Sequence, residues 1–337
     1  FIHIMFPIPP SETLRETKHC LQCQSSFPIT DKDIEFYEKV SPVFSGKRYS
    51  IPTPTLCPDC RQQRRLSFRN ERKLYKRKSD ATGKDIISIY SPDKPFTVYH
   101  QDYWWSDKWD PLEYGRDFDF TRSAMEQFQE LFSIIPMPGL IADASLNVNS
   151  EYVNFSGSSK NCYLVFENSD CEEVLYSYHI YSSKNCVDCL GILQSEYCFQ
   201  CVDVTSCYNL FFSQNSQNCR DSYFLQNCQN CSSCFFCSNL QNKEYCIYNK
   251  QYSRDQYFQE IQKIFTTPFS CYIKQFYSSK VDFIHQGNTC LGSNNSFGDF
   301  VIFSENTKQS YYSRSMKNSA YVQYFQESSD IYDAYSW

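Results

Sequence analysis

Four cysteines near the start of the chain have the types and the spacing of metal ligands. They form two Cys-x-x-Cys pairs, Cys20 with Cys23 and Cys57 with Cys60. Each pair predicts a tight turn whose two thiolates point at one ion, and two such turns complete the tetrahedral four-sulfur set that zinc prefers. The 33 residues between the pairs leave room for a helical turn near 31–39 and a proline-rich loop over 51–58. We therefore predict a structural zinc site.

A strongly basic segment follows the second pair directly. Residues 61–78 contain nine basic residues and one acidic residue, a local charge of +8. Since the net charge of the whole chain is −6, the remaining residues together carry −14. Such a cluster can neutralise the phosphates of RNA or DNA in a sequence-independent way. The alternative is a solvated segment that pairs with the acidic remainder of the chain or with a protein partner. The candidate nucleic-acid contacts are Arg61, Arg64, Arg65, Arg69, Arg72, Lys73, Lys76 and Arg77.

Most of the cysteines lie in a repetitive stretch. Residues 151–250 contain 13 of the 19 cysteines, and Cys186, Cys207 and Cys228 are 21 residues apart. A period of about 20 residues built from short strands is typical of a parallel β-helix. Small, weakly polar cysteines suit its crowded inward positions, as do Leu193, Phe211, Leu225 and Ile247. Asparagines such as Asn185, Asn218 and Asn227 suit its corners, where they can adopt left-handed backbone and stack.

The same stretch offers a second, less specific metal pattern. Four cysteines recur every third residue from Cys228 to Cys237, which approaches the spacing of iron–sulfur ligands. Stacked cysteines on a β-helix wall explain this spacing more simply. The candidates for a second metal site are Cys186, Cys189, Cys198, Cys201, Cys228, Cys231, Cys234 and Cys237.

Residue patterns for catalysis are sparse. The five histidines show no ligand or triad spacing, and no glycine-rich phosphate loop occurs. Many β-helical proteins cleave polysaccharides with paired carboxylates, and this stretch contains acidic residues between Asp170 and Asp203. The alternative function, from a different class, is therefore a β-helical carbohydrate-active enzyme. We predict no catalytic residues and no organic cofactor, and we leave enzymatic activity open.

The remaining segments predict smaller elements. Alternating apolar residues over 86–90 and 96–99 indicate two strands, and helical spacing over 122–135 indicates a helix. A second helix is expected over 253–264 with Ser253 as its N-cap, after which the repeat resumes with few cysteines. We predict three parts: 15–78, a zinc ribbon with a basic extension; 79–150, a small α+β connecting region; and 151–337, the β-helix interrupted by the second helix.

Composition sets the compartment that we expect. The chain has no secretory signal and no run of about 18 apolar residues, so we expect no membrane association. In a chain without a secretory signal, 19 cysteines indicate reduced thiols and metal ligands, so we expect the protein in the cytoplasm. The first residue is Phe1 and the chain ends at Trp337 in mid-repeat, so we expect both termini to be truncated.

The ribbon residues also resemble a known pattern. Cys20, Cys23, Phe27, Phe36-Tyr37, Pro54, Cys57-Pro58 and Cys60-Arg61 are similar to the probable zinc-ribbon family. Residues 57–109, 161–163 and 239–253 resemble a group of uncharacterised zinc-ribbon and Cys-rich repeat proteins from very small uncultured bacteria. The resemblance implies an architecture and no reaction.

Together these features predict a mainly β protein, with a zinc ribbon followed by a Cys-rich right-handed parallel β-helix and a few short helices. We expect a non-enzymatic zinc-binding scaffold or binding module that contacts nucleic acid through residues 61–78. The alternatives are the carbohydrate-active enzyme and a protein–protein interaction solenoid with no nucleic-acid role.

Overall fold

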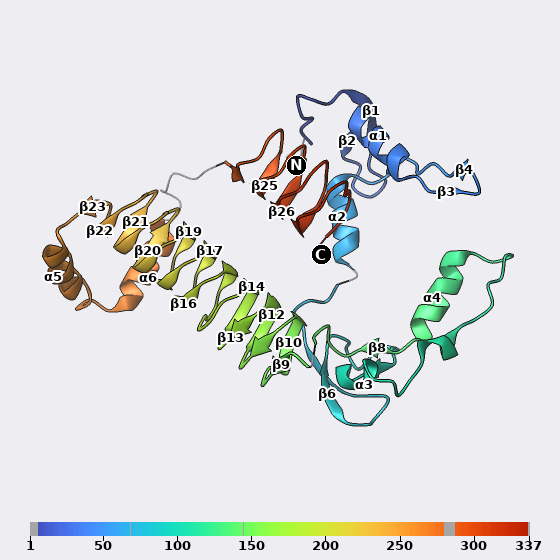
Figure 1. Cartoon of the computed structure of the whole chain (residues 1–337), viewed down its shortest axis with the longest axis horizontal. Coiled ribbons are helices and arrows are strands. Elements are labelled where there is room, and N and C mark those ends of the chain that lie inside the picture. Colours follow the sequence, from blue (N-terminus) through green and yellow to red (C-terminus); the bar gives the residue numbers. More distant parts are fainter. Residues whose placement is uncertain (1–5, 68, 144, 280–286, 336–337) are drawn as a thin grey trace. The chain divides into compact units, whose positions relative to one another are not determined.

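The structure is a computed structural model that describes all residues except 1–5, 68, 144, 280–286 and 336–337 (Figure 1). It is mainly β, with 38% of residues in strands and 19% in helices. The chain forms two compact units. The first comprises Phe1–Arg69 with His285–Trp337, and the second comprises Asn70–Ile284. Among the described residues, no helix is both long enough and apolar enough to cross a membrane.

The first unit combines the cysteine pairs with a small parallel sheet. β1 (Leu14–His19) and β2 (Ser26–Thr30) are antiparallel, and β3 (Val43–Phe44) and β4 (Lys47–Arg48) form a hairpin. The helices are α1 (Asp31–Val40) and α2 (Pro58–Leu66), and α1 is a ten-residue helix where a helical turn was expected near 31–39. This unit also contains a stack of four parallel strands. We call it the second stack, because a larger stack precedes it in the chain and is described below. Its strands are β24 (Cys290–Leu291), β25 (Gly298–Ile302), β26 (Ser310–Arg314) and β27 (Gln323–Gln326).

The second unit begins with short elements. β5 (Tyr75–Lys78) pairs with β6 (Asp85–Ser88), and β7 (Val98–Tyr99) pairs with β8 (Met137–Pro138). The two expected strands therefore exist, but each pairs with a different partner. α3 (Gln101–Trp104) and the 3-10 helix η1 (Pro111–Tyr114) precede α4 (Ala124–Ile134), which confirms the helix expected over 122–135.

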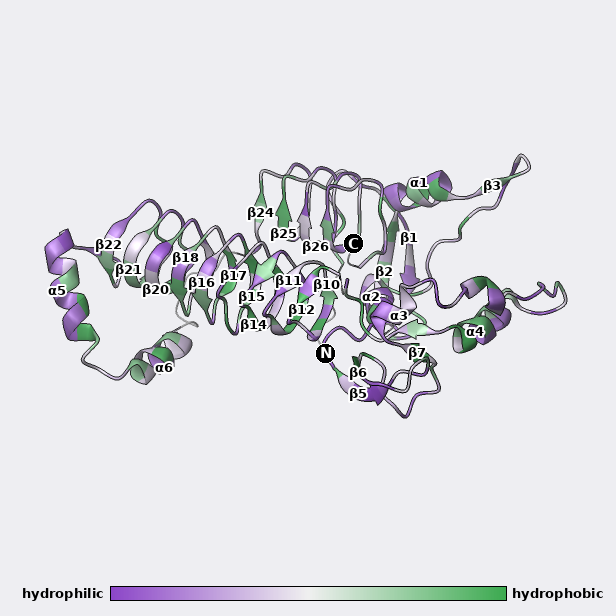
Figure 2. Cartoon of the chain, turned by 60° about the horizontal axis from the view of Figure 1, so that its bottom comes forward, coloured by the Kyte–Doolittle hydropathy of each residue, from purple (hydrophilic) through white to green (hydrophobic). Residues whose placement is uncertain are grey.

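Parallel strands fill most of the second unit and form the first stack. They are β9 (Asn147–Val148), β10 (Tyr152–Ser156), β11 (Ser159–Lys160), β12 (Tyr163–Ser169), β13 (Cys171–Glu172), β14 (Leu175–Tyr181), β15 (Leu190–Leu193), β16 (Glu196–Phe199), β17 (Val202–Thr205), β18 (Tyr208–Phe211), β19 (Gln214–Gln217), β20 (Arg220–Gln226), β21 (Ser232–Ser238) and β22 (Glu244–Ile247). Figure 2 shows hydrophilic and hydrophobic residues mixed along these strands.

The register of the first stack corrects the expected period of about 20 residues. Paired residues are 12 apart, as in Leu190↔Val202 and Tyr208↔Arg220. Every third residue has left-handed backbone, as at Tyr197, Gln200 and Asp203, so each 12-residue repeat has four corners. The spacing of 21 consists of a step of 12 from Cys186 to Cys198 and a step of 9 from Cys198 to Cys207, which are four and three such triplets. Their sum of 21 is seven triplets, which is not a whole number of repeats.

The inward residues of the first stack form its core. All 13 of its cysteines are buried there, with apolar residues such as Ile192 and Leu225. Leu225 therefore lies inward as predicted. Phe211 and Ile247 instead belong to a separate aromatic cluster, and Leu193 is half-buried outside both clusters. These three inward assignments were wrong, because each residue directly follows an inward residue (Leu210, Cys246 and Ile192, respectively) and therefore faces away from the core of the stack.

Hydrogen bonding explains why serine and cysteine share the inward positions. Ser195 Oγ accepts from the N–H of Cys207, one repeat later, at 3.0 Å, and donates to Leu193 O at 2.9 Å. Cys207 Sγ plays the same role, accepting from the N–H of Cys219 at 3.4 Å. An inward aliphatic side chain offers no such acceptor, and a buried N–H without a partner is costly. Small side chains with one donor and one acceptor are therefore favoured.

The corners and the following helix agree with the predictions. Asn185, Asn218 and Asn227 have left-handed backbone, and Asn218 Nδ2 donates to Asn230 Oδ1 one repeat later at 3.0 Å. Beyond β22, the short strand β23 (Lys250–Gln251) leads to α5 (Arg254–Ile264) and α6 (Phe269–Ser279). Ser253 is the N-cap of α5 in a capping box, as predicted.

Candidate metal centre

The first cysteine pair lies in a tight turn between β1 and β2. Gln24 has left-handed backbone at φ 63°, which reverses the chain immediately after Cys23. The N–H of Gln24 donates to Cys20 O at 2.9 Å, and the N–H of Cys20 donates to Ser25 O at 3.0 Å. These bonds hold both cysteines of the pair on one side of the turn.

The second pair lies at the start of α2. Cys57 is the N-cap, Pro58 occupies the first turn, and Cys60 follows within that turn. Proline suits this position because its missing N–H would have no helical partner there. The positive end of the helix dipole favours thiolates at both cysteines. Leu21 N–H donates to Thr55 O at 3.1 Å, which ties this segment to the first turn.

The two pairs bring four sulfurs together. All four lie within 4.8 Å of one another, and the Sγ atoms of Cys23 and Cys57 are 3.7 Å apart. A Zn–S bond of about 2.3 Å places the sulfurs of a tetrahedral site about 3.8 Å apart. The donor set therefore fits one metal ion. Among the described residues, no other group of three or more histidines, cysteines or acids meets the same distance limit.

The surroundings of the four sulfurs differ. Cys20, Cys57 and Cys60 are buried against Phe27 and Ile29, whereas Cys23 is exposed. Burial raises the pKa of Cys20, but backbone N–H groups outweigh it and lower this pKa to about 6. The side chain of Ser25 lowers the pKa of Cys23, while burial raises the pKa values of Cys57 and Cys60. The first pair therefore supplies thiolates most readily, and a bound ion would displace the protons of the second.

The basic residues nearest the centre are engaged inside the first unit. Arg61 Nε lies 2.7 Å from Asp333 Oδ1, its guanidinium stacks 4.8 Å from the ring centre of Tyr321, and only 6% of its side chain is exposed. Arg65 Nη1 reaches the same carboxylate at 3.2 Å. Arg69 lies over the ring of Tyr335 at 5.0 Å. Arg61, predicted as a nucleic-acid contact, is therefore buried and cannot face a phosphate in this conformation.

The other predicted contacts are divided between the two units. Arg64 is exposed in the first unit, and Lys73 and Lys76 are exposed in the second. Arg72 lies 5.2 Å over the ring of Tyr178. Arg77 pairs with Asp80 at 3.1 Å and keeps only 8% of its side chain exposed. The structure thus does not support one continuous basic surface over residues 61–78.

The candidate second-metal cysteines are all buried in the first stack. Cys228, Cys231, Cys234 and Cys237 are the four successive inward residues of one 12-residue repeat, facing inward from four sides. No three sulfurs of the stack meet the distance limit that the ribbon cysteines meet, within the described part of the chain. This geometry does not favour a preformed tetrahedral site there.

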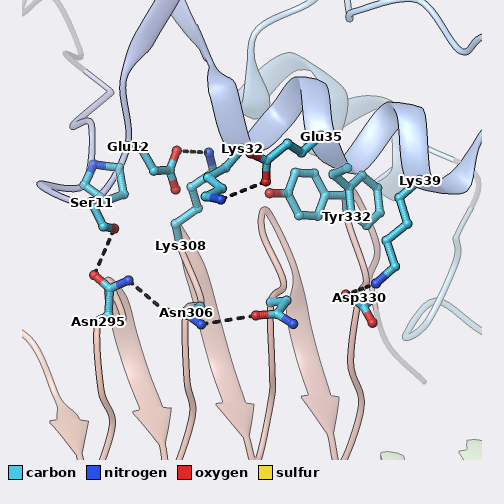
Figure 3. Close-up of a pocket in the computed structure, with 13 residues that line it drawn as sticks. Ser11, Glu12, Lys32, Glu35, Lys39, Asn295, Asn306, Lys308, Asp330 and Tyr332 are labelled. Atoms are coloured by element: carbon cyan, nitrogen blue, oxygen red, sulfur yellow. Dashed lines mark hydrogen bonds and ion pairs between the residues drawn. The ribbon is translucent and has the colours of Figure 1, made fainter.

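A cavity of about 440 Å³ lies between α1 and the second stack, inside the first unit (Figure 3). Its acids are all paired: Glu12 with Lys308 at 2.7 Å, and Glu35 with Lys32 at 2.7 Å. Asp330 pairs with Lys39, also at 2.7 Å. Glycoside hydrolysis needs two carboxylates of different protonation state on either side of a substrate. Acids that are each neutralised by a lysine do not provide that arrangement.

Lys308 and Asp333 are the residues of this unit that sequence reasoning missed. Lys308 Nζ lies 2.7 Å from Glu12 Oε2 and 2.8 Å from Asp33 Oδ1, and each of the three side chains is at most 10% exposed. Phe36 stacks on Tyr332 at 3.7 Å beside them. These contacts join residues almost 300 positions apart, and no local pattern signals them.

Comparison with known proteins does not assign the chain to a family. No protein-family model matches the chain, and no curated protein matches it.

Proposed function

We propose that this protein is a non-enzymatic binding module built around a structural zinc ion held by Cys20, Cys23, Cys57 and Cys60. The observation that carries the proposal is the convergence of four sulfurs within 4.8 Å. All four ligands are cysteines, and a closed four-sulfur set leaves no open position for a substrate. The zinc ion would stabilise the turn at Cys20 and the start of α2, and its role would be in folding.

Metal analysis of the purified full-length protein tests this proposal. We expect one zinc per chain in the wild type and none in Cys57→Ser/Cys60→Ser. The matched control is Cys271→Ser/Cys290→Ser, which removes two exposed cysteines outside the centre and keeps the zinc. Chelation should speed amide exchange in β1, β2 and α2, because binding energy at a structural zinc site is folding energy. A metal-free protein with unchanged exchange at these elements would contradict the proposal.

We further propose that both stacks are parallel β-helices. The 12-residue register, the left-handed residue at every third position and the inward serine and cysteine ladder support this architecture. A solenoid of this kind offers long, regular walls, which suit protein binding better than a reaction.

Deletion of one repeat tests the β-helix. Removing residues 196–207 takes out 12 residues and keeps every downstream side chain on its side of the repeat. Removing residues 196–206 takes out 11 and turns every downstream inward residue by one position. We expect the first deletion to preserve β-structure by circular dichroism and the second to disrupt it. Equal disruption by both deletions would show that no such repeat exists in solution.

A further inference from the structure

Three cysteines form a continuous column inside the first stack. Cys207, Cys219 and Cys231, the thiol column, are successive inward residues 12 apart, and the flanking pairs Tyr208↔Arg220 and Arg220↔Ser232 are in register. Neighbouring residues of the column are thus one strand spacing apart, about 4.8 Å. All three side chains are at most 3% exposed.

The thiols of this column are not required by the hydrogen bonding of the stack. Ser183 and Ser195 precede Cys207 in the same column, and each accepts from an N–H one repeat later. In the second stack, Ser293 and Ser304 accept in the same way. Serine therefore satisfies the backbone in both stacks, and what cysteine adds to the column is a soft, polarizable sulfur.

Cys207 and Cys219 form the best-defined pair of the column. The inward neighbours of Cys207 within its own turn are Val204 and Leu210, both fully buried. Cys219 donates its backbone N–H to Cys207 Sγ at 3.4 Å, and this bond favours a thiolate at Cys207. Cys231, in contrast, is flanked within its repeat by two further cysteines, Cys228 and Cys234.

The geometry selects the kind of ion. Since no three sulfurs of the described stack lie within 4.8 Å of one another, three- and four-sulfur coordination is not preformed. Two sulfurs stacked one repeat apart in a dry interior suit a soft monovalent ion that accepts linear coordination, and Cu(I) is the monovalent ion among the biological metals that thiolates bind. We propose that Cys207 and Cys219 bind one Cu(I) ion between them. On binding, two S–H bonds break, two Cu–S bonds form and two protons leave to solvent, with no change of oxidation state.

Anaerobic Cu(I) titration of the zinc-loaded full-length protein, in competition with a chromophoric Cu(I) chelator, tests the proposal. We expect the wild type to retain one more Cu(I) per chain than Cys219→Ser or Cys207→Ser. The matched control Cys231→Ser removes a thiol from the same column but outside the pair, and it should retain the wild-type number. X-ray absorption of the wild type should show that the additional Cu(I) ion, which Cys219→Ser lacks, is bound by two sulfurs.

Equal Cu(I) retention by wild type and Cys219→Ser would overturn the proposal, as would an equal loss in Cys231→Ser. Circular dichroism checks that each variant folds, which the serines already present in the column favour. If a variant does not fold, the absorption measurement on the wild type decides, and three or more sulfurs on every bound Cu(I) would contradict a two-sulfur site. Absence of zinc from the purified protein before Cu(I) is added would contradict the proposed ribbon centre alone.

Discussion

Replacing Lys308 with methionine tests how the ribbon and the second stack are held together. The ammonium group lies 2.7 Å from Glu12 and 2.8 Å from Asp33, and 7% of the lysine side chain is exposed. Methionine keeps the apolar stem but leaves two buried carboxylates facing each other without a cation. Removing one partner of a buried ion pair costs about 3–5 kcal/mol, because the remaining charge stays buried and uncompensated.

The measurement is amide hydrogen exchange, since it reports on one unit of the chain at a time. We expect exchange in β26 and α1 of Lys308→Met to accelerate by roughly two to four orders of magnitude, the equivalent of that free energy. The second unit should be unaffected. Lys317→Met is the matched control, because Lys317 pairs with Glu305 at 3.4 Å while both side chains are more than half exposed. Its expected cost is at most about 1 kcal/mol.

The reasoning fails if Lys308→Met accelerates exchange no more than Lys317→Met. That result would mean that water reaches Glu12 and Asp33 and solvates them without the lysine. A second change, Glu12→Gln in the Lys308→Met background, should recover part of the loss because it removes one of the two buried charges.

Three further predictions concern the first stack and its helix. Burial lowers the pKa of His179 to about 4, below its ordinary value, so the unfolded chain binds more protons between pH 4 and 6.5. Stability of the second unit should therefore fall by roughly 2 kcal/mol from pH 7 to pH 5 in urea titrations, and His179→Gln should weaken this dependence. Ser195→Ala leaves the N–H of Cys207 without its acceptor and should cost about 1–3 kcal/mol, whereas Ser195→Cys should cost less. Ser253→Ala removes the capping box of α5 and should cost about 1 kcal/mol, seen as faster exchange in that helix, while Ser253→Asp should keep it.

Each of these has a result that contradicts it. A pH dependence unchanged in His179→Gln would assign the acid sensitivity to other groups. Equal costs for Ser195→Ala and Ser195→Cys would show that sulfur does not replace the hydroxyl as an acceptor. Unchanged exchange in α5 of Ser253→Ala would show that packing against the aromatic cluster, and not the cap, holds the helix start.

Local spacing predicted the features whose physics is local. Two Cys-x-x-Cys pairs require tight turns, and those turns are present at Cys20 and at the start of α2. The caps and periodicities of α1, α4 and α5 also depend on residues within a few positions of each other, so these helices were foreseen. Inward burial of the cysteines follows from their size and weak polarity, and it was predicted as well.

The tertiary structure decided what depends on distant partners. The cysteine period of 21 pointed to the wrong repeat, because hydrogen bonding between strands sets a register of 12 and side-chain recurrence alone does not show it. Arg61 and Arg65 belong to a segment that is typical of a phosphate-binding cluster, yet both form ion pairs with Asp333. An arginine beside a metal centre looks the same in sequence whether it faces solvent or a carboxylate 272 residues away. Burial and charge pairing arise only when the chain folds, and they decide which of the predicted side chains remain at the surface.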